Sequence, residues 1–314
     1  MGSALVPELI LNGFIVTVFD TFWFGKSQFK NLNNLTLIEG DIRNTNDLTI
    51  AMDGQDAIIH LACISNDPSF DLDPKLGKAI NLDSFAPLIK VAKKSRIKRF
   101  IYASSSSVYG LKSETRVTED LTAEPLTDYS KYKYECEQIL LSEVNNEFAF
   151  CIVRPATICG YSPRQRFDLV VNILTASAIL DKKITVTGGP QFRPNLHIRD
   201  MVDAYLLLLN VKSLLINRKI YNIGGENLNL IQIANVVKEN SLLDCEINFT
   251  ETNDLRSYRI DSTKIRNELG FIPRKSIKEA VKDIVHAHQQ GKFEKDLRCS
   301  KYINISRMKE LRVT

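Results

Sequence analysis

Short runs of apolar residues, each followed by polar or turn-forming residues, recur along the first half of the chain. The runs are almost continuous in apolar residues, which is typical of strands buried on both faces of a parallel sheet. We therefore predict strands over Ile15–Phe19, Leu35–Ile38, Ala57–Ala62, Arg99–Ala103 and Phe148–Val153.

Between these runs, apolar residues recur at helical spacing. Leu76–Lys94 carries lysines late in the segment, where the helix dipole favours cations. Thr127–Glu143 carries Asp128 near its start. Strands that alternate with helices in this way predict an α/β fold with a doubly wound parallel Rossmann sheet and right-handed crossovers.

The pattern changes after about residue 160. An Arg- and Pro-rich loop at 162–166 opens this half, and residues 245–292 are expected to hold one strand and two short helices. The last twenty or so residues are basic and weakly patterned, so we expect them to be mobile. We predict a smaller lobe over the C-terminal ends of the strands, with helices at Leu169–Leu180, Met201–Asn210 and Leu230–Glu239 and strands at Ile184–Val186 and Ile220–Ile223.

Composition and charge exclude several classes of protein. The 41 basic and 37 acidic residues leave a net charge of +4, which argues against a nucleic-acid binder. No apolar stretch is long enough to span a membrane, and the N-terminus lacks the basic region of a signal peptide. The six cysteines form no CxxC pair, so we expect buried, reduced thiols in a cytoplasmic protein and no metal site.

The start of the chain differs from a complete Rossmann unit, which begins with a strand, a glycine-rich turn and a helix. Here Gly2 is followed by a helix-like segment at 6–13 and then by the strand that ends in Asp20. An acidic residue in that place holds a ribose hydroxyl, and its spacing from Gly2 fits Gly2 as the last glycine of the fingerprint. We therefore expect the first strand and two earlier glycines to be absent, which would weaken cofactor binding and leave an exposed edge or gap in the sheet. Because no Arg follows Asp20 directly, NAD is favoured over NADP.

A candidate catalytic group follows the fourth predicted strand. That strand runs into the serines at 104–107, and a YxxxK motif places Tyr129 and Lys133 on one helix face. An ammonium beside a phenol lowers the tyrosine pKa, which suits a general base, and a serine hydroxyl can bond the same substrate oxygen. A YxxxK motif also arises by chance as a solvated helix pair, so the prediction depends on the strand-end serines.

At these residues the chain resembles the extended short-chain dehydrogenase/reductases, in the NAD-dependent sugar-nucleotide epimerase/dehydratase family. The resemblance covers essentially the whole chain, in the right order. The matching segments are residues 2–10, VFD 18–20, GDIRN 40–44, HLAC 60–63, Asn81, YASSSSVYG 102–110, YSKYK 129–133, RPATICG 154–160, RPNLHIRD 193–200, YNIGG 221–225, RSYRID 256–261 and LGF 269–271.

The resemblance implies NAD as cofactor and an NAD-binding domain over residues 1–160, with residues 195–225 contributing. Residues 161–314 would form most of a substrate-binding lobe. The cofactor contacts implied are Gly2 and Asp20 as above, Asp41 and Ile42 at the adenine, Leu61, Ala62 and Cys63 along the pyrophosphate and ribose, Tyr129 and Lys133, and Pro155 and Ile158 at the nicotinamide.

The resemblance also implies a nucleotide-diphosphate sugar as substrate. Ser105 matches the family's catalytic hydroxyl, Tyr129 its base and Lys133 the partner of that base. Arg193 and Arg256 match arginines that grip the diphosphate, since an Arg fork suits phosphate oxygens. The substrate contacts implied are Asn66, Ser105, Asn172, Arg193 and Arg256.

The residues after Ser105 bear on the reaction type. Related dehydratases carry an Asp-Glu pair there, whereas this chain has Ser106 and Ser107, which cannot do that acid/base work. An epimerase resembling UDP-glucose 4-epimerases is therefore favoured. A dehydrogenase, reductase or dehydratase of the same family remains an alternative, as does a non-catalytic truncated relative that only binds a nucleotide sugar or a partner. The resemblance further implies a homodimer formed through the Leu76–Lys94 and Thr127–Glu143 segments.

Overall fold

Two parallel sheets form the larger half of the computed structural model, which describes residues 1–143, 148–252 and 256–312. The larger sheet has the order β3-β4-β5-β9 and the smaller pairs β1 with β2. All of these neighbours are parallel, which confirms the predicted α/β class. The strands are β1 (Val16–Asp20), β2 (Leu35–Glu39), β3 (Ala57–His60), β4 (Arg99–Ala103), β5 (Ala149–Pro155) and β9 (Lys219–Ile223).

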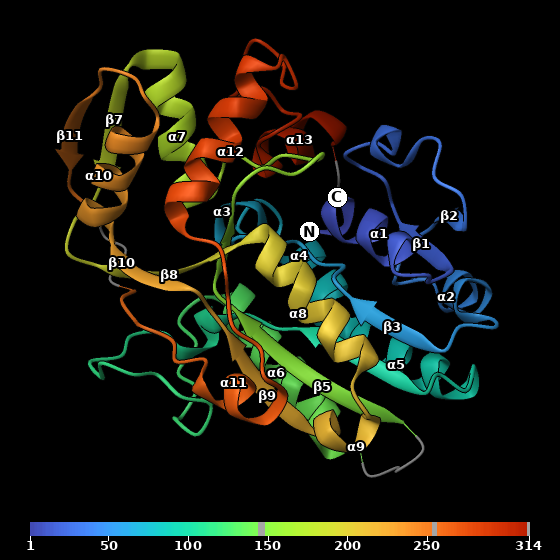
Figure 1. Cartoon of the computed structure of the whole chain (residues 1–314). Helices are drawn as coiled ribbons and strands as arrows, with labels where there is room; N and C mark the ends of the chain where they lie inside the picture. Colours follow the sequence, from blue (N-terminus) through green and yellow to red (C-terminus); the bar gives the residue numbers. More distant parts are fainter. Residues whose placement is uncertain (144–147, 253–255, 313–314) are drawn as a thin grey trace.

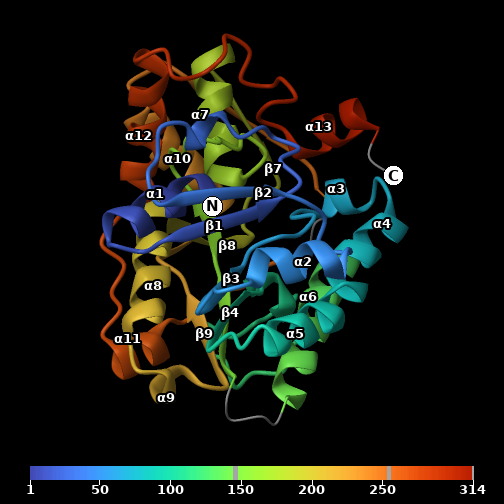
Figure 2. The ribbon, with the colours of Figure 1, turned by 90° about the vertical axis from the view of Figure 1, so that its right-hand side faces the viewer.

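The predicted gap in the sheet is confirmed. Among the described residues, β1 pairs only with β2 and β3 pairs only with β4, so each keeps one edge without a ladder partner. Figures 1 and 2 place the β1–β2 pair beside β3, and Val16 shares a core cluster with the partly buried Ile59. The two sheets are therefore held side by side through packed side chains.

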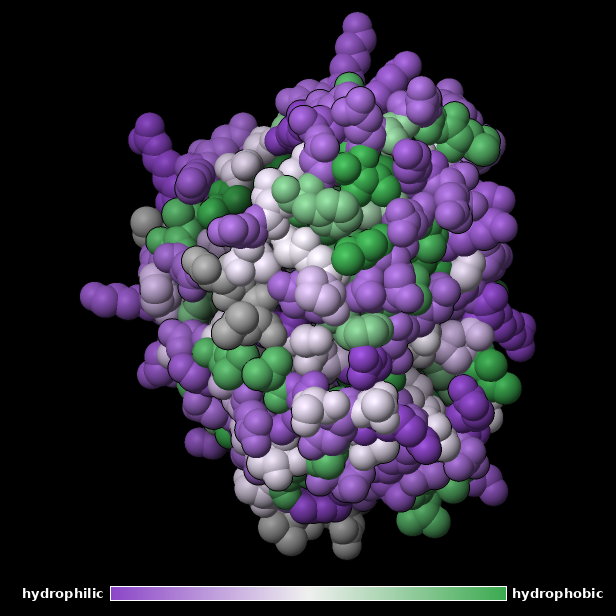
Figure 3. All heavy atoms as spheres, turned by 90° about the vertical axis from the view of Figure 1, so that its left-hand side faces the viewer, coloured by the Kyte–Doolittle hydropathy of each residue, from purple (hydrophilic) through white to green (hydrophobic). Residues whose placement is uncertain are grey.

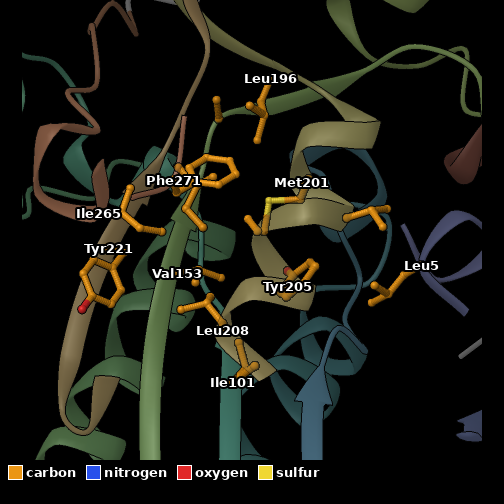
Figure 4. Packing of buried hydrophobic residues seen from close by; sticks show 14 of the residues in the cluster. Leu5, Ile101, Val153, Leu196, Met201, Tyr205, Leu208, Tyr221, Ile265 and Phe271 are labelled. Carbon is orange, nitrogen blue, oxygen red and sulfur yellow. The ribbon is translucent and has the colours of Figure 1, made fainter. Parts of the chain in front are cut away.

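Helices cover both faces of the larger sheet because successive strand residues point to opposite sides. Phe100 and Tyr102 pack with α5 and α6, whereas Ile101 packs with α8. Figure 2 shows α5 and α6 on one side of β4 and α8 on the other, and Figure 4 shows the cluster beneath α8. The helices of this half are α1 (Gly2–Leu11), α2 (Thr45–Met52), α3 (Asp67–Phe70), α4 (Pro74–Lys78), α5 (Phe85–Lys94), α6 (Asp128–Ser142), α8 (Ile198–Asn210), α9 (Ser213–Ile216) and α11 (Thr263–Leu269), with short 3-10 turns at Ser27–Phe29 and Ser106–Tyr109.

The predicted helix over Leu76–Lys94 is wrong in one respect, since a π-helical turn at Ala79–Asp83 separates α4 from α5. The side chain of Asn81, buried inside this turn, accepts a hydrogen bond from Ile64 N at 2.8 Å and donates one to Ile64 O at 2.9 Å. The wider turn therefore aims a buried amide at the loop that follows β3. Periodicity alone does not reveal this contact.

A smaller lobe lies beyond one end of the larger sheet (Figure 1). The helices and strands predicted after residue 160 are found, with ends that differ by at most three residues. Two of them do not belong to this lobe, because β9 pairs with β5 in the larger sheet and α8 packs on that sheet. On the side of α7 and α10 the surface is largely hydrophilic, with smaller apolar groups among the polar side chains (Figure 3). The elements here are α7 (Val170–Asp181), β7 (Lys183–Thr187), α10 (Leu230–Asn240), β11 (Glu246–Thr250) and α12 (Ile277–Gln289), and a small sheet of β10 (Glu226–Asn229), β8 (Phe192–His197) and β6 (Thr157–Cys159) adjoins them.

The expectation of a mobile C-terminal segment is wrong for residues 304–311, which form α13 (Asn304–Leu311). Met308 is buried in the core that contains α5 and β4, and Arg307 Nε donates a hydrogen bond of 2.7 Å to Trp23 O. These contacts bind the helix to distant parts of the chain, which a local pattern cannot show. The end of the predicted segment, residues 313–314, lies outside the described residues.

The cysteines carry free thiols, four of them buried and two, Cys63 and Cys299, partly buried. Within the described ranges, no helix is long and apolar enough to cross a bilayer.

Candidate active site

The serine run lies where β4 ends. Ser105 caps a 3-10 turn at Ser106–Tyr109, and its Oγ accepts hydrogen bonds from Ser107 N at 3.1 Å and Ser107 Oγ at 2.8 Å. Gly110 ends the turn at φ +69°, where an added Cβ would lie 2.1 Å from Glu124 O. The turn therefore holds the Ser105 hydroxyl at the carboxyl edge of the sheet, which is where ligands bind in open α/β sheets.

Tyr129 and Lys133 lie on the face of α6 that meets this edge. Thr127 and Ser130 form a capping box that fixes the first turn of the helix. Lys133 is buried, and its Nζ donates a hydrogen bond of 2.7 Å to Ala103 O. The same nitrogen lies 6.0 Å from the centre of the Tyr129 ring. The structure thus brings Ser105, Tyr129 and Lys133 together, as the sequence predicts.

The expected lowering of the Tyr129 pKa is wrong for this structure. Burial raises the pKa of Tyr129, and the neighbouring Cys63 and Asp67 raise it further. A hydrogen bond with Ser105 and the guanidinium of Arg166 act in the opposite direction. Removal of the phenol from water therefore outweighs its cationic surroundings, an effect that helical spacing cannot report.

An ionic cluster that sequence reasoning did not single out lies beside Tyr129. Arg166 pairs with Asp168, with Nε 2.8 Å from Oδ1, and its NH1 group donates to Ser65 Oγ at 3.0 Å. Asp168 Oδ2 also accepts from Asn66 Nδ2 at 3.2 Å and from Asn304 N at 3.1 Å. The Arg-rich loop was visible in the sequence, but its hydrogen-bond partners are up to 161 residues away.

The two arginines predicted to grip a diphosphate lie together. The guanidinium of Arg193 donates to the carbonyl oxygen of Arg256. Arg256 NH1 lies 2.6 Å from Oδ2 of Asp67, which directly follows Asn66. The other oxygen, Asp67 Oδ1, is buried and has no hydrogen-bond partner. Arg193 and Arg256 therefore lie beside the loop that carries Asn66 and Asp67. Asp67 is one of the groups that raise the pKa of Tyr129.

Asn172 is buried in α7 and braces the backbone. Its Oδ1 accepts from Gly160 N at 3.1 Å, and its Nδ2 donates to Arg166 O at 2.9 Å. These bonds explain its burial and hold the loop that carries Arg166. Contact with a substrate stays a prediction for this residue.

The first helix and first strand present groups suited to an anion and a ribose. Gly2 is the first residue of α1. An added Cβ there would meet nothing within 4 Å, so packing does not require a glycine at this position. Asp20 ends β1 and accepts from Phe22 N at 2.7 Å. Burial raises the pKa of Asp20, against the effects of that hydrogen bond and of Arg164.

Arg164 lies close to the start of α1, since its backbone N donates to Ser3 Oγ at 3.1 Å. Its Nε is buried without a hydrogen-bond partner. Burial, with the neighbouring Arg166, lowers the pKa of Arg164 to about 9. An unpaired guanidinium donor at a helix N-terminus is a suitable place for a phosphate group.

The other predicted cofactor residues lie at strand ends or in loops after them. Asp41 pairs with Arg43 at 2.7 Å, and the hydrogen bonds from Arg43 lower the pKa of Asp41 despite partial burial. Ile42 is buried beside them. Leu61, Ala62 and Cys63 follow β3, Pro155 ends β5 and Ile158 lies in β6. Their contacts with a cofactor stay predictions. In the described part of the chain, no group of three His, Cys, Asp or Glu side chains could hold a metal ion.

Comparison with known proteins assigns the family. Residues 1–224 match the NAD dependent epimerase/dehydratase family, so the chain belongs to that family. The fold is that of the extended short-chain dehydrogenases, and the family is NAD-dependent.

Similar proteins include both epimerases and dehydratases. An uncharacterized UDP-glucose epimerase of Bacillus subtilis is 28% identical over 296 residues, which cover 90% of this chain and 92% of that protein. The human dTDP-D-glucose 4,6-dehydratase is 27% identical over 83% of this chain and 77% of its own length. A UDP-glucuronic acid 4-epimerase from Bacillus cereus, solved with UDP-glucuronic acid and NAD, is 27% identical with a TM-score of 0.82, over 92% of this chain and 96% of that chain.

Proposed function

We propose that this chain epimerises a nucleotide-diphosphate sugar by transient oxidation of a ring hydroxyl to a ketone, with NAD as cofactor. The observation that carries the proposal is the convergence of Ser105, Tyr129 and Lys133 at the carboxyl edge of the sheet. The family and the nucleotide-sugar epimerases among its similar proteins support the same chemistry.

The residues present fit a dinucleotide. The buried, unpartnered Nε of Arg164 beside the start of α1 would hold a phosphate oxygen, and Asp20 at the end of β1 would hold a ribose hydroxyl. Leu61, Ala62 and Cys63 would line the path between these groups, and Pro155 and Ile158 would lie under the nicotinamide. When bound, the cofactor supplies the hydride acceptor and donor.

Tyr129 would move the proton. Its Oη would take the proton from a sugar hydroxyl as the carbon becomes a ketone, and would return it when the ketone is reduced on the opposite face. Because the phenol is neutral in its buried setting, the reaction depends on groups that favour the phenolate. The hydrogen bond from Ser105 and the charge of Arg166 act in that direction.

The substrate would enter from the smaller lobe, where Arg193 and Arg256 would bind the diphosphate and Asn66 would contact the sugar. Both arginines are already close to a carboxylate or a backbone oxygen, which fixes their guanidinium groups. A preorganised fork costs less entropy on binding than a free side chain. Residues 161–314 would accordingly supply most of the substrate contacts, and residues 1–160 with 195–225 most of the cofactor contacts.

The positions after Ser105 favour epimerisation over loss of water. Ser106 and Ser107 are both buried hydroxyls, and Ser106 Oγ lies 3.4 Å from Tyr258 OH. Neither group can protonate a leaving hydroxyl or remove a carbon-bound proton at neutral pH. The free thiols fit a reducing compartment, so we place this activity in the cytoplasm.

The test is to incubate the protein with NAD and UDP-, GDP- and dTDP-sugars in deuterated water, and to identify products by NMR. Epimerisation through a ketone returns the original hydride, so the product is a stereoisomer without solvent deuterium on carbon. Dehydration exchanges a carbon-bound proton, so deuterium in a deoxy-keto product would overturn the epimerase assignment. An oxidised sugar with a matching amount of NADH would indicate a dehydrogenase instead.

A further inference from the structure

A buried carboxylate lies on the same face of α6 as the proposed catalytic pair. Glu137 follows Lys133 by one helical turn, as Lys133 follows Tyr129, so the three residues share one face. Glu137 has no exposed surface. Because burial of an unpaired charge is costly, the partners of this carboxylate explain its presence.

Those partners lie at the carboxyl ends of two neighbouring strands. Ser104 Oγ donates to Glu137 Oε1. Arg154, next to the last residue of β5, donates to the same oxygen from Nε at 3.0 Å and to Oε2 from NH2 at 2.6 Å. The carboxylate is therefore held by an Arg fork and by a serine hydroxyl, with its orientation fixed.

The network extends across the sheet. Arg154 NH1 donates to Tyr109 OH at 2.8 Å, and that hydroxyl donates to Asn222 Oδ1 at 2.8 Å. Asn222 lies in β9, and its Nδ2 donates to Val117 O at 2.9 Å. Tyr109 and Asn222 are both fully buried. The carboxylate on α6 is thus tied to β4, β5 and β9 through polar groups alone.

We propose that Glu137 is a positioning residue that sets the place of α6 on the sheet, and with it the spacing of Tyr129 and Lys133 from Ser105. Two successive residues of the strand end are bound from two successive turns of the helix: Ala103 O by Lys133, and Ser104 Oγ by Glu137. Ser105 is the next residue. A slide or rotation of α6 would break both contacts, so the clamp holds the hydroxyl and the phenol in one register.

The chemistry of the pair supports a geometric role. A buried ion pair adds little net stability compared with apolar residues of similar size, because removal of two charges from water offsets their attraction. A bidentate pair does fix direction, which an apolar contact does not. Displacement of a reacting group by about 1 Å can cost about a hundredfold in rate, so such a clamp has a large effect on turnover.

The proposal rests on the proposed function, and its test is the Glu137→Gln variant, which keeps the length of the side chain and removes its charge. Asp200→Asn is the matched control: Asp200 is also buried, but its carboxylate accepts hydrogen bonds from the backbone N of Arg274 and of Lys275 at 2.9 and 3.0 Å, which join α8 to the segment before α12. Both variants are expected to melt at a lower temperature. Below that temperature, Glu137→Gln should lower kcat about tenfold or more with KM nearly unchanged, and Asp200→Asn should leave both constants near wild type.

A second readout does not depend on turnover. With ¹³C-labelled tyrosine, the ring resonance of Tyr129 is assigned by its loss in Tyr129→Phe. It should shift in Glu137→Gln and stay in place in Asp200→Asn. If the wild-type protein acts on no sugar of the panel but this shift is seen, the positioning role stands and the proposed function fails. If Glu137→Gln keeps the wild-type kcat and the wild-type Tyr129 resonance, the positioning role is overturned.

Should Glu137→Gln fail to fold, Ser104→Ala takes its place. This variant removes one hydrogen bond to the same carboxylate and leaves the Arg154 pair intact. It should shift the Tyr129 resonance in the same direction, with a smaller loss of kcat. An unshifted resonance with full kcat in this folded variant would equally overturn the proposal.

Discussion

The ammonium of Lys133 donates a hydrogen bond of 2.7 Å to the carbonyl oxygen of Ala103, which ends β4 two residues before Ser105. A lysine in this position is removed from solvent and bound to the strand end. The charge that accompanies Tyr129 is therefore fixed to the same strand that carries the serine hydroxyl. This contact joins the two halves of the proposed catalytic group.

Replacement of Arg164 should weaken NAD binding. In Arg164→Met the buried, unpartnered Nε near the start of α1 is lost. A hydrogen bond to a charged group is worth about 1.5–3 kcal/mol, so Kd should rise about ten- to a hundredfold. Fluorescence titration with NAD measures this. Arg199→Met is the control. Arg199 also lies near α1, but it is exposed and its NH1 group lies 2.6 Å from Oε1 of Glu8. Equal affinity in Arg164→Met and wild type would remove Arg164 from the cofactor site.

Replacement of Arg256 should affect the sugar nucleotide instead. Arg256→Met removes a guanidinium from the group formed with Arg193 and Asp67, so KM for the nucleotide sugar should rise about tenfold or more. The Kd for NAD should not change. Arg116→Met is the control, since Arg116 forms an exposed pair with Asp261. An unchanged KM in Arg256→Met would count against the proposed diphosphate contact.

Buried His60 should make the protein less stable in mild acid. Burial, with the charge of Lys133, lowers the pKa of His60 to about 3 from its ordinary value of 6.5. The unfolded chain therefore binds a proton below pH 6.5 that the folded chain does not. The free energy of unfolding decreases as the pH is lowered from about 6.5 to about 3. For His60 alone the loss from pH 7.5 to pH 5 is about 2 kcal/mol.

Urea unfolding at these two pH values checks that figure. His60→Phe is the comparison, because the His60 ring lies among the rings of Phe85, Phe100 and Tyr102 and an aromatic replacement suits that site. The variant should lose about 2 kcal/mol less than the wild type on acidification. An identical pH dependence in both proteins would show that His60 titrates normally.

We also predict a homodimer through α5 and α6. Sedimentation at micromolar concentration should show a dimer, and Glu135→Arg on the exposed side of α6 should shift it toward monomer by placing unmatched charge in the contact. Glu239→Arg on α10 is the control, as it lies in the smaller lobe. A wild-type protein that sediments only as a monomer would exclude this assembly.

The parts of the fold that are determined by short-range patterns could be predicted from sequence. The strand Arg99–Ala103 is found with its predicted bounds, and α6 lies within the predicted Thr127–Glu143. The meeting of Tyr129 with Lys133 follows from helical spacing, and that of both with Ser105 follows from strand order. These features are local or are set by the topology of a parallel sheet.

The parts that depend on distant contacts could not be predicted. Asn304 binds Ser65 and Asp168, which lie 239 and 136 residues away, so the order in α13 is not visible in its weak local pattern. The raised pKa of Tyr129 depends on burial under residues from other segments. The role that we propose for Glu137 could not be predicted from the pattern of α6 alone, because its partner Arg154 lies on a different element, 17 residues later.

The most direct test of the account is the rate at which wild type and Tyr129→Phe convert a nucleotide sugar to its epimer, with NAD present and folding checked by circular dichroism. The account predicts that the wild type forms the epimer and that Tyr129→Phe is slower by about a hundredfold or more, since the phenol is the group that moves the proton. A folded Tyr129→Phe variant that epimerises the sugar at the wild-type rate would contradict it.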